Sequence, residues 1–527
     1  MHIHRFHGGL NLPGHKEHAT RQPLRDCPLP AHLRLPLLQH SGDPSRPQVA
    51  VGDRVVAGQC IAEPDGLRGI ALHAPAAGIV SAIAPITLAY PPGVEVDCIE
   101  ITVDAEARGS TDRAAIQRMP TMDPWTTEPQ ALIDRIRAAG VVGLGGAGFP
   151  TADKLTGGHG LLALNGAECE PYISCDEMLL RERPDEVLLG AALLARTIAA
   201  DRIVLAVEDR MTTARAALEA ALTELTWPEA APPIELITVP TRYPEGGERQ
   251  LIRVLTGLEV PRGGLPADIG VLVHNVATAA AAWRAVVDGL PLIERIVTVT
   301  GPGIMAPCNL RVALGTSVAA VVAEAGGYHP QAARLVIGGP MMGVALADDD
   351  YPLGKTGNCV LALSAEQIAS PGPELPCIRC AACADVCPAR LLPQQLLWHI
   401  QSENWGRAES DGLIDCIECG CCDLACPSHI PLVQYFRYGK TELRHRQHEA
   451  ERAAAAKLRH DARQARLARE AEARALRQAQ RKTDTTSASA VAEAIARAKA
   501  RREQRNDPGR APEHNEPDRA AHNDTST

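Results

Sequence analysis

The sequence predicts a multidomain α/β protein, and three observations along the 527-residue chain support this prediction. Short β-branched runs punctuated by Gly and Pro come first, and strands that alternate with helices follow them. Two cysteine-dense segments lie at residues 377–388 and 416–427, late in the chain. Because domains usually have about 100–200 residues, a chain of this length holds several. We expect five regions, at residues 1–125, 126–300, 301–360, 366–440 and 441–527.

The first region, residues 1–125, is predicted to be a small β domain. The runs "VAVGDRVVAGQCIAEP" and "LHAPAAGIVSAIAP" are short, β-branched and bounded by Gly and Pro, which favours a barrel or sandwich. The phrases "VGDRVVAGQ" and "HAPAAGIV" resemble the barrel-sandwich fold of lipoyl and biotinyl carrier domains. The hairpin between them reads "EPDGLRGIALHAP" and has no Lys at the position that carriers modify. We therefore expect the fold without a carrier role.

The second region, residues 126–300, alternates helical and strand patterns. Helical spacing in "PQALIDRIRAAG", "PDEVLLGAALLARTIAA" and "MTTARAALEAALTEL" alternates with buried-strand runs in "GLLALNGAE", "DRIVLAVED" and "PIELITVP". This order predicts βαβ units and a mostly parallel, Rossmann-like sheet. Residues 301–360 contain "NLRVALGTSVAAVVAEAGG" and "RLVIGGPMMGVAL", which predict a small β-rich domain.

Composition and charge exclude several classes of protein. The chain is 45% apolar and 22% charged, as in soluble globular proteins. Its net charge is −10, whereas nucleic-acid-binding domains are usually basic, so no nucleic-acid partner is expected. The N-terminal residues contain no apolar signal region, and no uncharged apolar run approaches the roughly 18 residues that a membrane span needs. We expect a cytoplasmic protein whose membrane contact, if any, is peripheral.

The last region, residues 441–527, is predicted to be helical and then disordered. Residues 441–482 combine 12 Lys and Arg with 6 Asp and Glu and have strong helix propensity but little apolar surface. The final stretch, residues 506–527, has the polar composition of a disordered segment. The basic helix could touch anionic lipid or a partner protein, but a solvated helix without a partner is the favoured interpretation.

The two cysteine segments, "CIRCAACADVCP" and "CIECGCCDLACP", share the spacing C-x2-C-x2-C-x3-C-P, and the cysteines at these positions make up half of the 16 in the chain. The second segment contains one further cysteine, Cys421. This spacing is typical of two 4Fe–4S clusters, in which the fourth Cys of each motif ligates the other cluster. Structural zinc sites are the alternative, but they usually separate C-x2-C pairs by a longer loop. The rule predicts one cluster on Cys377, Cys380, Cys383 and Cys426, and a second on Cys416, Cys419, Cys422 and Cys387.

A glycine-rich segment, "GVVGLGGAGFPTADKL", is the second candidate site. Its glycines allow close backbone approach to a planar or phosphorylated ligand, and Lys154 follows as a possible phosphate cation. It is not the G-x-G-x-x-G motif that follows a first Rossmann strand, and taken alone it could be an ordinary turn.

The segment "GLGGAGFPTADK" resembles part of the NADH- and flavin-binding subunit of respiratory complex I and related hydrogenases. The segments "LNGAECEP", "YPEGGERQL" and "HNVAT" resemble further segments of that family, in the same order. The resemblance implies that NADH stacks near Phe149, with Glu170 at its polar edge. It implies an FMN site on Gly145, Gly146, Gly148, Lys154, Asn165, Glu168, Gly246, Glu248 and Asn275.

The order of modules resembles the C subunit of the Rnf electron-transport complexes, which are also called Rsx. The order is a barrel-sandwich domain, a flavin domain, a soluble-ligand-binding-type β domain and a helical two-cluster ferredoxin, and "FHGGLNLPGHKEHAT" fits the family's start. The resemblance covers about residues 1–440. It implies a peripheral protein on the cytoplasmic face of the bacterial inner membrane. This protein would exchange electrons with NADH, and its partner subunits would couple the electron transfer to ion movement. A soluble NAD-linked oxidoreductase and a cluster module without flavin remain as alternatives.

Overall fold

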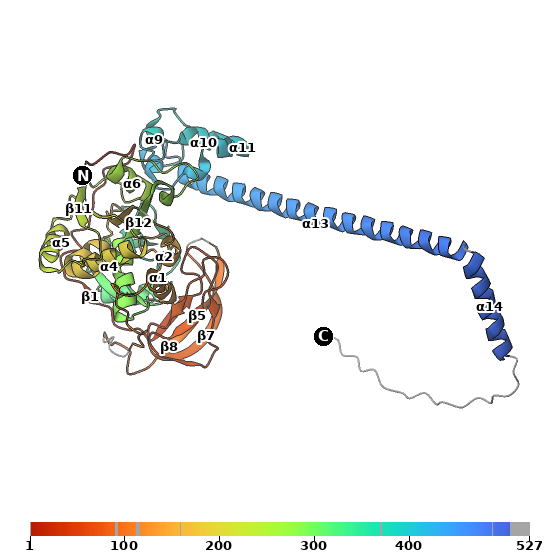
Figure 1. Cartoon of the computed structure of the whole chain (residues 1–527). Helices are drawn as coiled ribbons and strands as arrows, with labels where there is room; N and C mark the ends of the chain where they lie inside the picture. Colours follow the sequence, from red (N-terminus) through yellow and green to blue (C-terminus); the bar gives the residue numbers. More distant parts are fainter. Residues whose placement is uncertain are drawn as a thin grey trace. The chain divides into compact units, whose positions relative to one another are not determined.

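The computed structural model describes residues 2–89, 93–111, 116–158, 160–368, 372–486 and 488–505. Two compact units divide the chain, residues 1–441 and residues 442–527. The first unit contains three β-containing domains and a helical cysteine module, and Figure 1 shows its strands and helices in sequence colours. The predicted multidomain α/β class is therefore confirmed.

The N-terminal domain consists of two small antiparallel sheets. One sheet has the order β2-β8-β7-β4 and the other β3-β5-β6. In the second half of β8 the side chains alternate, so that Ile99, Ile101 and Val103 are fully buried while Glu100 and Thr102 between them are more exposed. This alternation is what a strand with one covered face requires. The strands are β2 (His32–Pro36), β3 (Arg46–Pro47), β4 (Arg54–Val55), β5 (Cys60–Glu63), β6 (Leu72–His73), β7 (Gly78–Thr87) and β8 (Glu95–Val103).

The second domain contains a four-stranded sheet with every neighbouring pair parallel. Its order, β11-β10-β9-β12, places the first strand between the second and the fourth, as in a Rossmann fold. The strands are β9 (Leu161–Gly166), β10 (Arg202–Glu208), β11 (Ile234–Val239) and β12 (Val271–Asn275). The sheet is buried on both faces, which is why its strands read as continuous apolar runs.

Helices cover both faces of this sheet. Leu162 and Leu205 face a core shared with α4 and α7, whereas Ala163 and Val204 face a core shared with α6. The helical segments are α1 (Pro129–Ala138), α2 (Thr151–Lys154), α3 (Cys175–Glu182), α4 (Pro184–Thr197), α5 (Thr212–Glu224), α6 (Glu248–Thr256), η1 (Pro266–Ile269), α7 (Val276–Trp283) and the π-helical turn η2 (Arg284–Asp288). The predicted alternation of helix and strand is confirmed.

The third domain contains a six-stranded mixed sheet with the order β1-β14-β13-β17-β15-β16. Its first strand comes from the N-terminus of the chain and pairs with β14. The predicted range 301–360 leaves out β13 and the end of β17, because β13 pairs with β14 and β17 rather than with the parallel sheet. The elements are β1 (Arg25–Asp26), β13 (Glu294–Thr300), β14 (Cys308–Ala313), α8 (Val318–Glu324), β15 (Ala332–Ile337), β16 (Val344–Ala345) and β17 (Cys359–Ser364).

The cysteine module is built from short helices around a small apolar core. Leu396, Leu413 and Phe436 are almost completely buried in it. Its helices are α9 (Ala382–Asp385), α10 (Pro393–Gln401), α11 (Trp405–Ser410), η3 (Leu413–Asp415), α12 (Cys421–Ala425) and the start of α13 (Leu432–Thr486).

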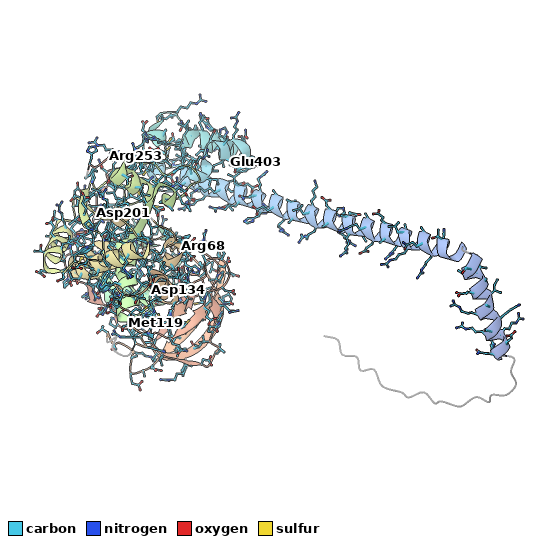
Figure 2. All side chains as sticks on the ribbon, viewed as in Figure 1. Arg68, Met119, Asp134, Asp201, Arg253 and Glu403 are labelled. Atoms are coloured by element: carbon cyan, nitrogen blue, oxygen red, sulfur yellow. The ribbon has the colours of Figure 1, made fainter. Side chains whose placement is uncertain are left out.

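The second unit contains the remainder of α13 and α14 (Ala488–Arg505). Almost every described side chain in it is exposed, and Figure 2 shows side chains projecting on all sides of both helices. The predicted helix is present, whereas the stretch predicted to be disordered, residues 506–527, lies outside the described residues. Within the described ranges, no helix is both long and apolar enough to cross a membrane.

Candidate functional site

The carboxyl edge of the parallel sheet brings together the polar residues that the sequence singles out. Asn165 lies near the end of β9 and Asn275 ends β12, and the two residues pair across the neighbouring strands. The strand order reverses between these two strands, and in open α/β sheets ligands bind at the carboxyl ends of the strands at such a point. Asn165 Nδ2 donates to the carbonyl of Gly246 at 2.8 Å, which fixes the loop before α6 beside the strand end.

The glycine loop lies against the same edge. Gly143 N donates to the carbonyl of Phe149 at 2.8 Å, which closes the loop, and Leu144 N donates to Thr278 Oγ1 at 2.9 Å. A Cβ on Gly145 would come within 3.2 Å of Asn275 Cβ, whereas one on Gly146 would meet nothing within 4 Å. Gly146 has a φ of +113°, which only glycine adopts readily. The loop therefore presents an open stretch of backbone beside Asn275, which fits a planar or phosphorylated ligand.

Two of the predicted flavin residues are paired with each other. Lys154 Nζ lies 2.7 Å from Glu248 Oε1 and also donates to the carbonyl of Val273 at 3.4 Å. The sequence predicted Lys154 as a cation for phosphate. Its charge is instead compensated by a predicted neighbour, because α6 begins with Glu248 beside the end of α2.

A buried group of charges lies beneath the loop. Glu168 accepts hydrogen bonds from the N–H groups of Asp176 and Glu177 at the start of α3, and Asp176 Oδ2 accepts from Asn275 Nδ2 at 2.6 Å. Burial and the Glu168 charge raise the pKa of Asp176 to about 7. Lys16 Nζ lies 3.7 Å from Glu168 Oε2. Burial alone would lower the pKa of Lys16, but the surrounding carboxylates raise it.

Sequence reasoning missed the roles of Asp176, Cys175 and Lys16 in this group. Ligand atoms of Glu168, Cys175 and Asp176 lie within 4.8 Å of one another. The available signals were the acidic first turn of α3 and the Lys that ends the N-terminal "FHGGLNLPGHK" segment. Neither signal identified a partner, because Lys16 meets Glu168 across 152 residues of chain.

Glu170 is held by the third domain. Its Oε1 accepts hydrogen bonds from Met341 N at 2.7 Å and Met342 N at 3.0 Å. Burial raises the pKa of this carboxyl group, and these N–H donors partly oppose the rise. The sequence placed Glu170 at the polar edge of NADH, whereas the structure directs one carboxylate oxygen to the loop after β15.

The two cysteine motifs have the same backbone conformation between their first three cysteines. Arg379 and Ala381 have φ values of +59° and +63°, and the equivalent Glu418 and Gly420 have values of +57° and +76°. Non-glycine residues in this region are strained, by roughly 1–2 kcal/mol each, and such strain is concentrated at functional sites. The conformation turns both chain segments tightly around their first three cysteines.

The cysteines are grouped across the motifs. Cys387 lines one pocket together with Cys416, Cys419 and Cys422. Burial raises the pKa of the Cys383 thiol, and the nearby Cys426 and Cys380 thiols add to the rise. Each group thus combines residues of one motif with a single residue of the other, and all described cysteines are free thiols. These groups fit the two clusters that the spacing predicts.

The extra cysteine of the second motif, Cys421, is fully buried beside this pocket. A hydrogen bond between its thiol and that of Cys419 lowers the pKa of Cys419. Cys421 therefore supports a neighbouring residue that is predicted to be a ligand, and the sequence had assigned Cys421 itself no role.

The loop that carries Gly246 also contacts the second cysteine motif. Tyr243 Oη donates to the carbonyl of Cys419 at 2.7 Å, and the Tyr243 side chain is only 2% exposed. At the other end of the loop, Gly246 N donates to Cys169 Sγ at 3.2 Å. One short segment therefore joins the edge of the parallel sheet to the pocket that contains Cys419.

An N-terminal segment, residues 4–16, reinforces this junction, and we call it the strap. Leu10 and Tyr243 exchange backbone hydrogen bonds of 2.7 and 2.9 Å. Gly9 N donates to the carbonyl of Val386 at 2.9 Å, and His7 Nδ1 lies 3.0 Å from the carbonyl of Cys387. The strap therefore ties the second domain to the cysteine module.

Comparisons with known proteins agree with this architecture. Residues 4–106 match the RnfC barrel sandwich hybrid domain, residues 136–284 match the Nuo51 FMN-binding domain, and residues 296–345 match the SLBB domain. A relative from Yersinia pestis bv. Antiqua (strain Antiqua) is the C subunit of an ion-translocating oxidoreductase complex, and it is 43% identical over 487 residues, which is 92% of this chain and 76% of the relative. The chain belongs to this RnfC family.

A relative of the same name from Pseudomonas aeruginosa is 44% identical over 477 residues, which is 90% of this chain. The alignment covers 60% of that relative, so the chain spans about three fifths of its length. Among solved structures, the chain is similar to a chain of an NAD+-reducing NiFe hydrogenase in the H2-reduced state, with a TM-score of 0.43 and 19% identity over 61% of this chain and 64% of that one.

Proposed function

We propose that this RnfC protein passes electrons between NADH and two 4Fe–4S clusters through FMN, as a peripheral part of a membrane-bound ion-translocating complex. Family membership supports a role in an oxidoreductase complex. The observation that supports the electron path is the hydrogen bond from Tyr243 Oη to the carbonyl of Cys419, which joins the flavin-domain loop to the second motif at 2.7 Å.

In this proposal the chain's residues bind and orient the cofactors, and no acid–base pair or nucleophile is required. The open backbone at Gly146, with Gly145 packed against Asn275 beside it, would hold the flavin at the crevice. FMN supplies the conversion between two-electron hydride transfer and one-electron transfer. The two sets of four cysteines that the spacing predicts would hold the clusters, and the buried position of Cys419 and Cys422 keeps water from the second set.

The proposed partners are NAD(H) and the other subunits of the Rnf complex, and the proposed location is the cytoplasmic face of the bacterial inner membrane. The residues of the first unit would provide the redox site, and partner subunits would provide the membrane attachment. A soluble NAD-linked oxidoreductase would use the same site without partners. Co-fractionation with membranes only when the other subunits are coexpressed would support the complex, and membrane-independent activity in cells that contain them would contradict it.

A cluster module without flavin is the second candidate, and two observations favour it. Lys154 is paired with Glu248, and Glu170 is bonded to the backbone of the third domain. Anaerobic purification followed by iron, sulfide and flavin analysis separates the two candidates. Our proposal predicts releasable FMN and rapid bleaching of flavin and cluster absorbance by NADH in stopped flow. Iron and sulfide without FMN and without bleaching would establish the module instead.

A further inference from the structure

The hairpin between β5 and β6 of the N-terminal domain reaches the glycine loop. Its residues 64–69 read "PDGLRG", and the Arg68 guanidinium carbon lies 4.9 Å from the centre of the Phe149 ring. Figure 2 labels Arg68 at the side of the N-terminal β domain. Phe149 is the residue at which the sequence predicts dinucleotide stacking. The N-terminal domain therefore contributes a cation to the mouth of a site that belongs otherwise to the second domain.

Hydrogen bonds hold this hairpin in place. Leu67 N donates to Asp43 Oδ2 at 2.6 Å, and Asp43 N donates to the carbonyl of Leu67 at 3.0 Å. In the same segment as Asp43, Ser41 N donates to the carbonyl of Gly148 at 2.9 Å. Gly42 lies so close that its Cβ would come within 2.7 Å of the carbonyl of Arg68. Hydrogen bonds thus connect the hairpin to the segment at residues 41–43, and connect that segment to the glycine loop.

A buried lysine fixes the base of the hairpin to the second domain. Lys355 is 1% exposed, and its Nζ donates to the carbonyls of Ala71 at 3.0 Å and Gly140 at 2.6 Å. Ala71 follows the hairpin, and Gly140 precedes the glycine loop. Because one side chain bonds both backbones, the distance between Arg68 and the glycine loop is set by the fold and not by a flexible linker.

Arg68 itself has an unusual backbone conformation. Its φ is +58°, a region that side chains with a Cβ rarely adopt. Strain of this kind is retained mainly where a site needs a particular orientation. The side chain is exposed apart from its contact with Phe149. In the part of the chain that the structure describes, no ion pair forms between Arg68 and a carboxylate, whereas Lys154 is paired with Glu248.

We propose that Arg68 binds the diphosphate of the nicotinamide dinucleotide at the mouth of the glycine loop. The inference rests on the proposed function and deepens it, because it identifies which cation meets the anionic part of the substrate. A guanidinium group presents a planar fork of N–H donors that matches phosphate oxygens in pairs. Lys154 cannot supply this contact without leaving Glu248, so the N-terminal domain completes the substrate site.

The test measures binding and reduction separately in the full chain. We expect Arg68→Ala and Arg68→Gly to weaken binding of ADP-ribose, measured by calorimetry, by about tenfold or more, because a charge-assisted contact is lost. Arg68→Gly also relieves the positive φ, so it controls for backbone strain. Arg68→Lys should recover only part of the affinity. Arg54→Ala, which removes another exposed arginine of the same domain, should leave binding unchanged.

Two electron donors separate binding from a structural effect. We expect kcat/KM for NADH to fall about tenfold in Arg68→Ala, while kcat/KM for reduced nicotinamide riboside, which has no phosphate, stays unchanged. Equal losses with both donors, or ADP-ribose binding equal to that of the unaltered chain, would overturn the inference. Calorimetry with ADP-ribose does not involve flavin or clusters. The inference can therefore fail while NADH still reduces the protein, and the proposed electron transfer can fail while Arg68 still binds the diphosphate.

Discussion

The two cysteine motifs share their spacing and their backbone conformation but have different surroundings. In the first motif Cys380 is exposed, and the neighbouring Ile378 is 67% exposed. In the second motif Cys419 and Cys422 are each 7% exposed, and Tyr243 contacts the same region. The repeat thus determines the shape of each ligand loop, while contacts from distant segments determine which loop faces the flavin domain. The second motif is the inner one and the first is the outer one.

Removal of one of the cysteines that are predicted to ligate the cluster of the other motif tests this distinction most strongly. Cys387→Ala should abolish the inner cluster, on Cys416, Cys419 and Cys422, and leave the outer cluster intact, although Cys387 belongs to the first motif. About half of the bound iron should be lost, since each cluster needs its four thiolates. Electron paramagnetic resonance of the reduced protein identifies the surviving signal.

The matched variant is Cys426→Ala, which should abolish the outer cluster and spare the inner one. If Cys387→Ala instead abolished the outer cluster, or Cys426→Ala the inner one, each motif would supply its own fourth ligand. A protein that binds zinc and no iron would contradict both assignments.

A core substitution should distinguish the two motifs in stability. Phe436 lines the pocket of the inner motif and is 1% exposed. Phe436→Ala should lower the free energy of unfolding of the module by about 3–5 kcal/mol, because it leaves a cavity. Ile378→Ala at the outer motif should cost less than about 1 kcal/mol. Urea unfolding, monitored by cluster absorbance, measures the free energy of unfolding of both variants. Equal losses of stability would contradict the distinction between the inner and the outer motif.

The strap joins the flavin domain to the cysteine module, and a single glycine tests that contact. A Cβ on Gly8 would come within 2.6 Å of the backbone of Val386, and Gly8 has a φ of +70°. Gly8→Ala should destabilise the junction by roughly 2–3 kcal/mol, which combines overpacking with backbone strain. Gly109→Ala has a similar φ of +73° but open space around it, so it should show the backbone cost alone. Thermal unfolding of both variants isolates the steric part.

The smallest expected effect is on reduction potentials. Tyr243→Phe keeps the ring but removes the hydrogen bond to the carbonyl of Cys419. The inner cluster should become harder to reduce, by roughly 20–60 mV, if the lost bond contributes about 0.5–1.5 kcal/mol. The outer cluster should keep its potential. Redox titration followed by electron paramagnetic resonance reports both, and equal shifts of the two clusters would argue against a specific role for Tyr243.

The sequence predicted local features well and distant pairings poorly. The alternating strands and helices, the glycine loop and the paired cysteine motifs are patterns of neighbouring residues, and the structure contains the corresponding elements. Lys154 and Glu248 were both predicted at the flavin, but their mutual ion pair spans 94 residues of chain. Glu170 meets Met341 across 171 residues. Such contacts depend on how the domains pack against each other, and neither the periodicity of apolar residues nor the spacing within a motif predicts them.

The strap has a consequence for biosynthesis. His7 leaves the ribosome before its partner Cys387, which follows 380 residues later. At about 5–20 residues per second, His7 waits roughly 20 to 80 s before its partner in the cysteine module has been translated. The three upstream domains can fold in that interval, and Leu10 can already pair with Tyr243, but the contacts of Gly9 and His7 with Val386 and Cys387 form only afterwards. Docking of the strap onto the cysteine module is therefore a late event in maturation, and it coincides with the time at which that module becomes available to bind the proposed clusters.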